Sequence, residues 1–163
     1  MNKLSDGVTL RPAVPEDAPT IAEIWHLGWR DGHLGSVPEE LMAARHEDSF
    51  RTRAAPRVSD TTVAVIEGQI VGFVMVVGDE VEQVYVSALH RGAGVADVLL
   101  REAERQIREG GHSTAWLAVV AGNPRARRFY ERNGWSDKGL FDYAAVGEHG
   151  PIPVPAHRYV KNL

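Results

Sequence analysis

The chain is most informative between Gln83 and Ala96, where it reads QVYVSALHRGAGVA. An apolar run ends in this stretch, a turn of small residues follows, and an amphipathic helix begins directly after the turn. Glycine and alanine let the backbone come close to a ligand, so that successive N–H groups can converge above the helix start. The partial positive charge of the helix N-terminus adds to the attraction for an anion. The stretch therefore predicts a phosphate-binding turn.

Two other kinds of glycine-rich phosphate site fit the sequence poorly. A P-loop closes with Gly-Lys-Ser/Thr, and Ala96-Asp97 stand where that closure would be. A dinucleotide-binding turn belongs to the first strand–helix–strand unit of a parallel array, whereas this turn follows an antiparallel meander. A strand–helix connection without a ligand is the alternative when the glycines are taken by themselves.

Length and composition restrict the class of protein. The chain has 163 residues, a formal net charge of −4 and no cysteine, which predicts a single domain over residues 1–163 and excludes disulfides, thiolate zinc sites and cysteine nucleophiles. The mild negative charge argues against a general nucleic-acid or anionic-membrane binder. No apolar run approaches the ~20 residues of a membrane span, and Met1–Gly7 lacks the apolar core of a signal peptide. We expect a cytoplasmic enzyme or binding domain with no nucleic-acid or membrane partner.

The hydrophobic pattern alternates between the periods of strands and helices. The predicted strands are Val8–Val14, Thr61–Ile66, Gln69–Val77, Val81–Val86, Ser113–Val120, Trp135–Ala145 and Val154–Val160. The predicted helices run from Pro15 to near Gly32 and over Pro38–Arg53, Gly94–Glu109 and Asn123–Arg132. This order predicts an α+β fold with a single mixed, mostly antiparallel twisted sheet of about seven strands flanked by about four helices.

Two motifs resemble the GCN5-related N-acetyltransferase (GNAT) family. The family's phosphate motif, Gln/Arg-x-x-Gly-x-Gly/Ala, is matched by residues 91–96, RGAGVA. A second family feature is an asparagine followed seven residues later by a tyrosine and then by a glycine-aromatic turn, here Asn123, Tyr130 and Gly134-Trp135. The order of elements also matches over nearly the whole chain. The resemblance implies the acyl-CoA N-acyltransferase fold, acetyl-CoA as the acetyl donor and an amine as the acceptor.

The resemblance also implies where the coenzyme binds. Its pantetheine arm would pair like an added strand with Val84-Tyr85-Val86, and the Val86 N–H would polarise the thioester carbonyl. Asn123 would cap its helix and hydrogen-bond the pantetheine or a water, with Ala126 close by on the same helix. The diphosphate would lie on the main-chain N–H groups of Arg91, Gly92, Ala93, Gly94, Val95 and Ala96.

Acetyl transfer to an amine needs a base and an acid. An alkyl ammonium with a pKa of ~10 must lose its proton before it can attack. Glu82 is the candidate base, where some family members carry a catalytic glutamate; Glu80, Asp79, His112, His26 and water are the alternatives, and an exposed carboxylate is the non-catalytic interpretation. Tyr130 matches the family's general acid, which protonates the leaving thiolate; its alternative is a core tyrosine beside Phe129.

The acceptor pocket is expected near the end of the first helix. We assign Trp25 to the core, and Trp29 and His33 to the pocket wall. We interpret Asp142–Pro155 as a long loop that either covers the acceptor or meets a second copy of the chain in a homodimer. The predicted acceptor is a primary amine of a small molecule or an amino-acid-like compound, with no metal cofactor. Acetylation of a protein N-terminus or lysine, and a non-catalytic acyl-CoA-binding sensor, are the alternatives.

Overall fold

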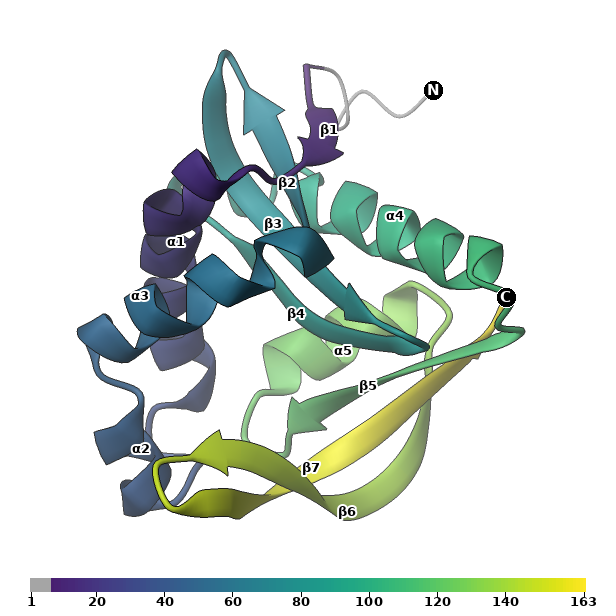
Figure 1. Cartoon of the computed structure of the whole chain (residues 1–163). Helices are drawn as coiled ribbons and strands as arrows, with labels where there is room; N and C mark the ends of the chain where they lie inside the picture. The colour runs from purple at the N-terminus through teal and green to yellow at the C-terminus, as the bar shows by residue number, and fades with distance from the viewer. Residues whose placement is uncertain (1–6) are drawn as a thin grey trace.

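The computed structural model describes residues 7–163, which form one seven-stranded sheet and five α-helices (Figure 1). The strands are β1 Thr9–Pro12, β2 Thr61–Ile66, β3 Gln69–Val77, β4 Glu80–Val86, β5 Thr114–Val120, β6 Ser136–Gly147 and β7 Gly150–Asn162. The helices are α1 Ala18–His33, α2 Glu39–Ala44, α3 Glu47–Ala54, α4 Val95–Glu109 and α5 Pro124–Arg132, with short 3-10 turns at Pro15–Asp17, Ala55–Asp60 and Ala88–His90. The sequence analysis predicted that Met1–Gly7 is not a signal peptide. Except for Gly7, these residues lie outside the described range.

The sheet is mixed and mostly antiparallel, which confirms the predicted fold class. Its strand order is β1-β2-β3-β4-β5-β7-β6, and only the β4–β5 pair is parallel. The predicted hairpin between β2 and β3 turns through Glu67 at φ 50° and Gly68 at φ 79°. Positive φ at both central residues is what a two-residue hairpin with a type I′ turn requires.

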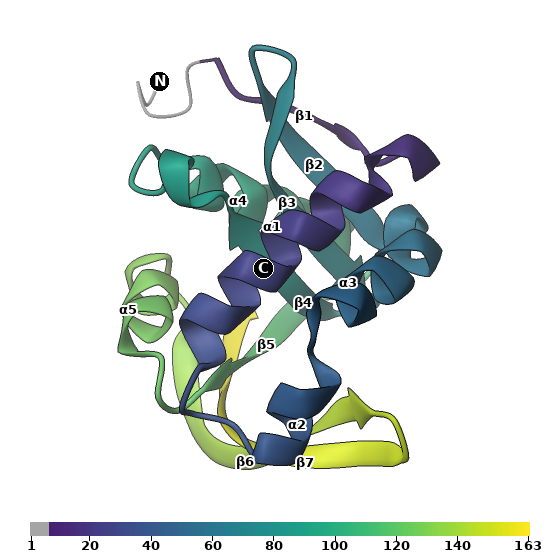
Figure 2. The same ribbon diagram turned by 90° about the vertical axis from the view of Figure 1, so that its left-hand side faces the viewer.

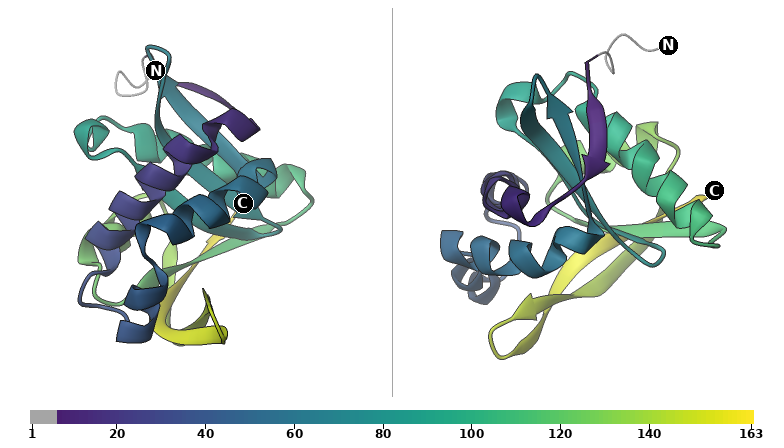
Figure 3. Two further views of the ribbon diagram at one scale, coloured as in Figure 1. Left: turned by 60° about the vertical axis from the view of Figure 1, so that its left-hand side comes forward. Right: turned by 45° about the horizontal axis from the view of Figure 1, so that its top comes forward.

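Two hydrophobic cores lie on opposite faces of the sheet. Helices α1 and α3 cover one face of β1–β4 and α4 covers the other, as Figure 2 and the right panel of Figure 3 show. Trp25 of α1 is fully buried on the first face, with its ring centroid 5.5 Å from that of Phe50 and 6.1 Å from that of Phe73. On the second face the inner stripe of α4, which includes Leu99 and Ile107, packs against the sheet. The sequence assignment of Trp25 to the core is confirmed.

The prediction of a single helix over Pro38–Arg53 is wrong. Arg45 leaves the helical region (φ −102°, ψ 49°) and His46 is extended, so that the segment forms two helices, α2 and α3. The two helices have different partners: α2 contacts β6, whereas α3 packs against α1. The break at Arg45 lets the chain turn between these partners.

The loop predicted over Asp142–Pro155 is also wrong, because the segment is a β-hairpin. Strands β6 and β7 pair from Ser136↔Val160 up to Gly147↔Gly150. Pro151, Pro153 and Pro155 alternate along β7 in a part that β5 does not reach, since the β5 pairing stops at Val120↔Ala156. Prolines at alternate positions of a strand can all direct their missing N–H toward a free edge, so they leave the pairing with β6 intact.

Close packing between α1 and β4 generates a stability prediction. A Cβ atom at Gly28 would overlap the ring of Tyr85. Alanine normally stabilises a helix by about 1 kcal/mol over glycine. Here we expect Gly28→Ala to lower the free energy of unfolding by about 1–3 kcal/mol in chemical denaturation, because the ring must move.

The neighbouring Leu27, which is 53% exposed, supplies the matched control. Leu27→Ala should change the free energy of unfolding by less than about 0.5 kcal/mol. A stability gain from Gly28→Ala would contradict the close approach.

Candidate active site

The parallel strands β4 and β5 separate after a single paired position. Their only register pair is Glu80↔Trp116, and Figure 1 shows the two strands parting beyond it. The register between β3 and β4 jumps from Met75↔Gln83 to Val76↔Val81, so Glu82 is the extra residue of a β-bulge on β4. A bulge bends its strand and increases the local twist, which accounts for the divergence from β5.

Main-chain groups of β4 face the resulting gap. Ser87 donates its N–H to the carbonyl of Val71 on β3 at 2.8 Å. In an antiparallel pair the direction of the hydrogen-bonding groups alternates along the strand, so Tyr85 also faces β3, and Val84 and Val86 face away from it. With β5 parted, the N–H and C=O groups of Val84 and Val86 are left for a ligand.

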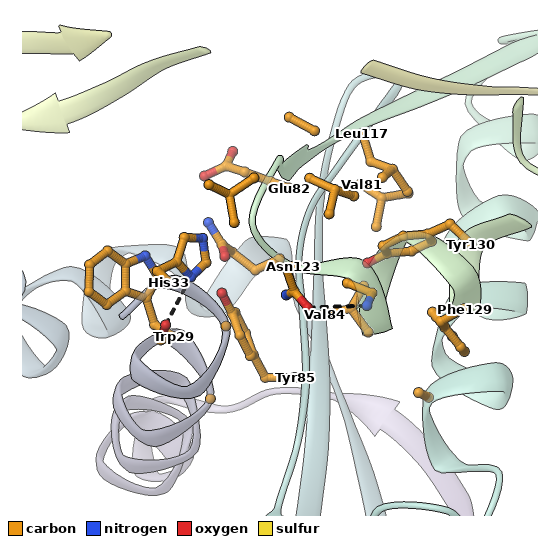
Figure 4. A pocket seen from close by; sticks show the side chains of 18 of the residues that line it. Trp29, His33, Val81, Glu82, Val84, Tyr85, Leu117, Asn123, Phe129 and Tyr130 are labelled. Carbon is orange, nitrogen blue, oxygen red and sulfur yellow. Dashed lines mark hydrogen bonds between the residues drawn. The ribbon is translucent and has the colours of Figure 1, made fainter. Parts of the chain in front are cut away.

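A cavity of about 560 Å³ occupies this region. Its wall is built from β4, β5, the C-terminal half of α1, α5, the start of α4 with the turn before it, part of the β6–β7 hairpin, and residues of the α2–α3 segment. Figure 4 labels side chains from α1, β4, β5 and α5 around it. Among the predicted site residues, the structure places on the wall Trp29, His33, Glu82, Val84, Tyr85, Val86, Arg91, Gly92, Gly94, Val95, Ala96, Asn123, Ala126 and Tyr130. Ala93 lies in the turn but not on the wall.

The predicted phosphate turn has the backbone shape that an anion site needs. Gly92 lies at φ 81° and Gly94 at φ 83°, in the left-handed region that favours glycine. The Arg91 N–H is already directed at the Ala88 carbonyl (3.5 Å), whereas no backbone acceptor among residues 7–163 takes the N–H groups of residues 92–97. The Arg91 guanidinium donates to Asp31 of α1 at 2.7 Å, so this side chain joins the turn to α1. The free main-chain donors thus begin at Gly92.

Helix α5 carries the second motif. Asn123 caps it, because its Oδ1 accepts the Ala126 N–H at 3.2 Å. Seven residues on, Tyr130 packs its ring against those of Phe129 (5.1 Å) and Trp135 (6.2 Å), and Figure 4 shows its hydroxyl directed into the cavity. Burial raises the pKa of the Tyr130 phenol well above its usual value. The phenol is therefore protonated at neutral pH and can serve as a proton donor.

Two carboxylates on β4 also line the cavity, and both have partners. Glu82 accepts a hydrogen bond from Arg57 at 2.7 Å, and Glu80 accepts one from the Tyr143 hydroxyl at 2.9 Å. Burial is the main cause that raises the pKa of Glu80. The other candidate bases lie elsewhere: Asp79 accepts from the Trp116 indole at 3.1 Å, His26 packs 5.2 Å from the Phe50 ring, and His112 is exposed in the turn after α4. None of these three lines the cavity.

The end of α1 contributes an aromatic wall. The Trp29 and His33 rings stack at 4.7 Å with an interplanar angle of 7°. The Nδ1 of His33 lies 2.8 Å from the Trp29 carbonyl. Because a carbonyl can only accept, Nδ1 donates and Nε2 keeps its lone pair. Burial lowers the pKa of His33, and the imidazole is therefore neutral at neutral pH. His33, one of two histidines on the cavity wall, thus offers a proton acceptor.

Comparison with known proteins agrees with this geometry. Residues 19–135 match the model of the acetyltransferase (GNAT) family. The chain is 33% identical to a streptothricin acetyltransferase of Streptomyces lavendulae, over 92% of this chain and 78% of that protein. The fold is shared by the PaiA N-acetyltransferase of Thermoplasma acidophilum in complex with coenzyme A, with a TM-score of 0.74 and 18% identity over 96% of this chain and 99% of that one. It is also shared by a phosphinothricin acetyltransferase of Sinorhizobium meliloti in complex with acetyl-CoA, with a TM-score of 0.67 and 22% identity over 96% of this chain and 89% of that one.

The chain belongs to the GNAT acetyltransferase family. It is an acyltransferase of that family, and the resemblance that the sequence motifs indicated is confirmed. Within residues 7–163 of this GNAT chain, no helix is long and apolar enough to cross a membrane. In the same residues, no group of three or more histidine or acidic side chains is arranged to hold a metal ion.

The cavity-wall residues of this GNAT enzyme that sequence reasoning missed include the arginines Arg45 and Arg53. Arg45 follows α2 and Arg53 lies near the end of α3; both line the cavity. A signal was present in their spacing, because Arg45 stands four residues after Leu41, and Arg53 three after Phe50. Each arginine therefore shares the inward face of its helix with an apolar residue that is buried.

Burial of the tyrosines in this GNAT enzyme predicts an alkaline titration. Burial is the main cause that raises the pKa values of Tyr85, Tyr130, Tyr143 and Tyr159, which are the four tyrosines of the sequence. The folded protein should therefore show little phenolate absorbance at a pH of about 10, where exposed tyrosine is half ionised.

In denaturant the same titration should show all four phenols ionising at pH ~10. Because only the unfolded state loses these protons there, the stability from the buried phenols should be complete below pH ~10 and fall as the pH rises further. Half-ionisation of the folded protein at pH ~10 would contradict the burial.

Proposed function

We propose that this chain transfers the acetyl group of acetyl-CoA to the primary amine of a small-molecule or amino-acid-like acceptor, within a single domain spanning residues 1–163. The observation that carries the proposal is the juxtaposition of the turn at residues 92–96, with its unpaired N–H groups, and the parted strands β4 and β5. In support, the two structural neighbours are complexes with coenzyme A and acetyl-CoA, and one relative and one of these neighbours are named for the small molecules streptothricin and phosphinothricin.

The residues on the cavity wall fit the coenzyme. The diphosphate would accept hydrogen bonds from the main chain at residues 92–96, where the left-handed glycines keep side chains out of the way. The amides of the pantetheine arm would pair with the exposed main chain of Val84 and Val86, as an added strand does. Asn123 uses its Oδ1 for the helix cap, which leaves its Nδ2 to donate to the pantetheine or to a water.

The chemical step joins the amine nitrogen to the acetyl carbonyl carbon and breaks the C–S bond of the thioester. The Val86 N–H would stabilise the oxyanion that forms on the carbonyl oxygen. Glu82 would take the proton of the amine, directly or through a water, with the neutral His33 as the histidine alternative. Tyr130 would give its phenolic proton to the leaving thiolate and recover one from solvent.

The relatives named for small molecules favour a small acceptor over a protein. The β6–β7 hairpin lines the same cavity with Tyr143 and Val146 as α1 does with Trp29 and His33, so an acceptor there would contact both elements. The protonated Tyr130 at the cavity favours an enzyme over a sensor, because a sensor needs no proton donor.

The proposal is tested by a thiol-release assay of the purified protein with acetyl-CoA and a panel of primary amines. We expect release of free coenzyme A that depends on the amine, together with one acetylated product by mass spectrometry. Binding of coenzyme A without acetylation of any amine would support the sensor instead.

Coenzyme binding should depend on the glycines of the turn. Gly94 lies at φ 83°, where a β-branched residue is strained, and a side chain there would crowd the free N–H groups. We expect Gly94→Val to weaken coenzyme A binding by about 100-fold or more, about 2.7 kcal/mol, in titration calorimetry.

Gly35 is the matched control, since it lies at φ 79°, has no atom within 4 Å of the place where a Cβ would lie, and is not on the cavity wall. Gly35→Val should bind coenzyme A as the wild type does. Unchanged affinity in Gly94→Val would remove the phosphate assignment.

If Tyr130 is the proton donor, removing its hydroxyl should lower the turnover number without weakening the binding of coenzyme A. Tyr130→Phe keeps the ring and its packing and removes only the hydroxyl. We expect kcat to fall by about 10²–10⁴-fold, while the Kd for coenzyme A changes by less than about threefold.

Tyr159→Phe is the control, because the Tyr159 hydroxyl is engaged by Arg127 and Glu131 away from the cavity; its kcat should match that of the wild type. Parallel losses of kcat and coenzyme affinity in Tyr130→Phe would make Tyr130 a packing residue.

A further inference from the structure

Two arginines on the cavity wall, Arg45 and Arg53, form no ion pair with the residues that the structure describes. Arg45 is only 7% exposed and lines the cavity, yet its side chain makes no hydrogen bond or ion pair with any residue of the described range 7–163. The Arg53 guanidinium lies 4.5 Å above the Trp25 ring, and its Nη1 is buried without a hydrogen-bond partner in the same range. Neither guanidinium therefore has an ion pair of its own within that range, and the carboxylate whose charge acts on Arg53, that of Glu82, is already paired with Arg57.

The nearby carboxylates are already engaged. Glu82 and Asp60 both accept from Arg57, at 2.7 and 3.1 Å, and Glu80 accepts from Tyr143. Within residues 7–163, the buried side-chain polar atoms that lack a hydrogen-bond partner are Trp25 Nε1, Arg53 Nη1 and Arg57 Nη2. All three are donors, and Arg53 lies close to the other two residues. Trp25 and Arg53 line the cavity and Arg57 does not, so a ligand there would need an acceptor for the first two, and the charge of Arg53 favours an anion.

The electrostatics of the two guanidinium groups also favours a negatively charged ligand. A buried guanidinium without a counter-charge is unfavourable, and a ligand that supplies the charge recovers part of that cost when it binds. Burial, together with the charges of Arg45 and Arg57, lowers the pKa of Arg53 to about 10, although the charge of Glu82 opposes this shift. The group is therefore still cationic at neutral pH. Guanidinium groups bind carboxylates through paired hydrogen bonds, and Trp25, under Arg53, adds an indole N–H.

We propose that the acceptor carries a free carboxylate as well as its amine, and that Arg45 and Arg53 bind this carboxylate while the amine faces β4. This inference rests on the proposed function and narrows its acceptor to free amino acids. A polyamine has no carboxylate, and a lysine side chain or N-terminus within a protein presents amides in its place. The carboxylate takes no part in the bond changes of acetyl transfer; it orients the acceptor.

The test compares acceptors that differ only in the carboxylate. Thiol release from acetyl-CoA is measured with the L-amino acids, their carboxamides, the corresponding decarboxylated amines and spermidine. We expect at least one amino acid to exceed its carboxamide and its decarboxylated amine by about 30-fold or more in kcat/KM, the loss typical of removing one partner of a buried charge pair. Equal rates for acids, carboxamides and amines, or a preference for spermidine, would overturn the inference and leave the acetyltransferase proposal standing.

Variants assign the effect to the two arginines. Arg45→Gln and Arg53→Gln should each lower kcat/KM for the amino acid by about 30-fold or more, chiefly through KM, and should leave kcat/KM for the carboxamide within about threefold. Arg51→Gln is the matched control, because Arg51 lies on the same helix as Arg53 but is 63% exposed and pairs with Glu47. Equal losses on the acid and the carboxamide would overturn the carboxylate assignment.

A binding measurement makes the result independent of turnover. Calorimetry with the amino acid and coenzyme A should show equal affinity for the wild type and Arg51→Gln, and an affinity weaker by about 30-fold or more for Arg45→Gln. Carboxylate-dependent binding without thiol release would support the anion site and count against the transferase. The thermal midpoint of Arg45→Gln without ligand should equal or exceed that of the wild type, since no ion pair is lost; a clear fall would indicate a structural role and overturn the inference.

Discussion

The divergence of β4 from β5 is the constraint on which the rest of the structure depends. One extra residue, Glu82, bends β4 away from its parallel neighbour, so the sheet stays continuous at Glu80↔Trp116 and opens beyond it. The opening exposes main-chain groups of Val84 and Val86 in the middle of a sheet, where such groups are ordinarily paired. The free helix start at residues 92–97 follows the end of the same strand.

Local patterns were enough to predict several elements, two of which line the cavity. The β2–β3 hairpin, α4 and α5 follow the expected boundaries closely, because turn residues, apolar periodicity and the Asn123 cap act over a few positions. The motifs at residues 91–96 and at Asn123–Trp135 also sufficed to place most of the predicted site on one cavity wall. These are properties that neighbouring residues determine among themselves.

Features that depend on distant partners could not be predicted. The break at Arg45 arises because α2 and α3 pack against different elements, and the periodicity of the segment carries no record of this. The alternating prolines of β7 indicated a loop because the free edge that tolerates them exists only once β5 has ended. The unpaired state of Arg45 and Arg53 is likewise a tertiary property, since charge counting cannot show which carboxylates Arg57 and Tyr143 already occupy.

The row of Pro151, Pro153 and Pro155 has a consequence for the integrity of the open sheet. A sheet whose strands separate in its interior exposes strand edges with unpaired backbone groups. A strand of another chain could pair with such an edge, which is a route to aggregation. The prolines have no N–H to donate at this edge of β7, so a strand of another chain could not form a regular ladder with it. The sheet can therefore remain open beside the hairpin without pairing with another chain.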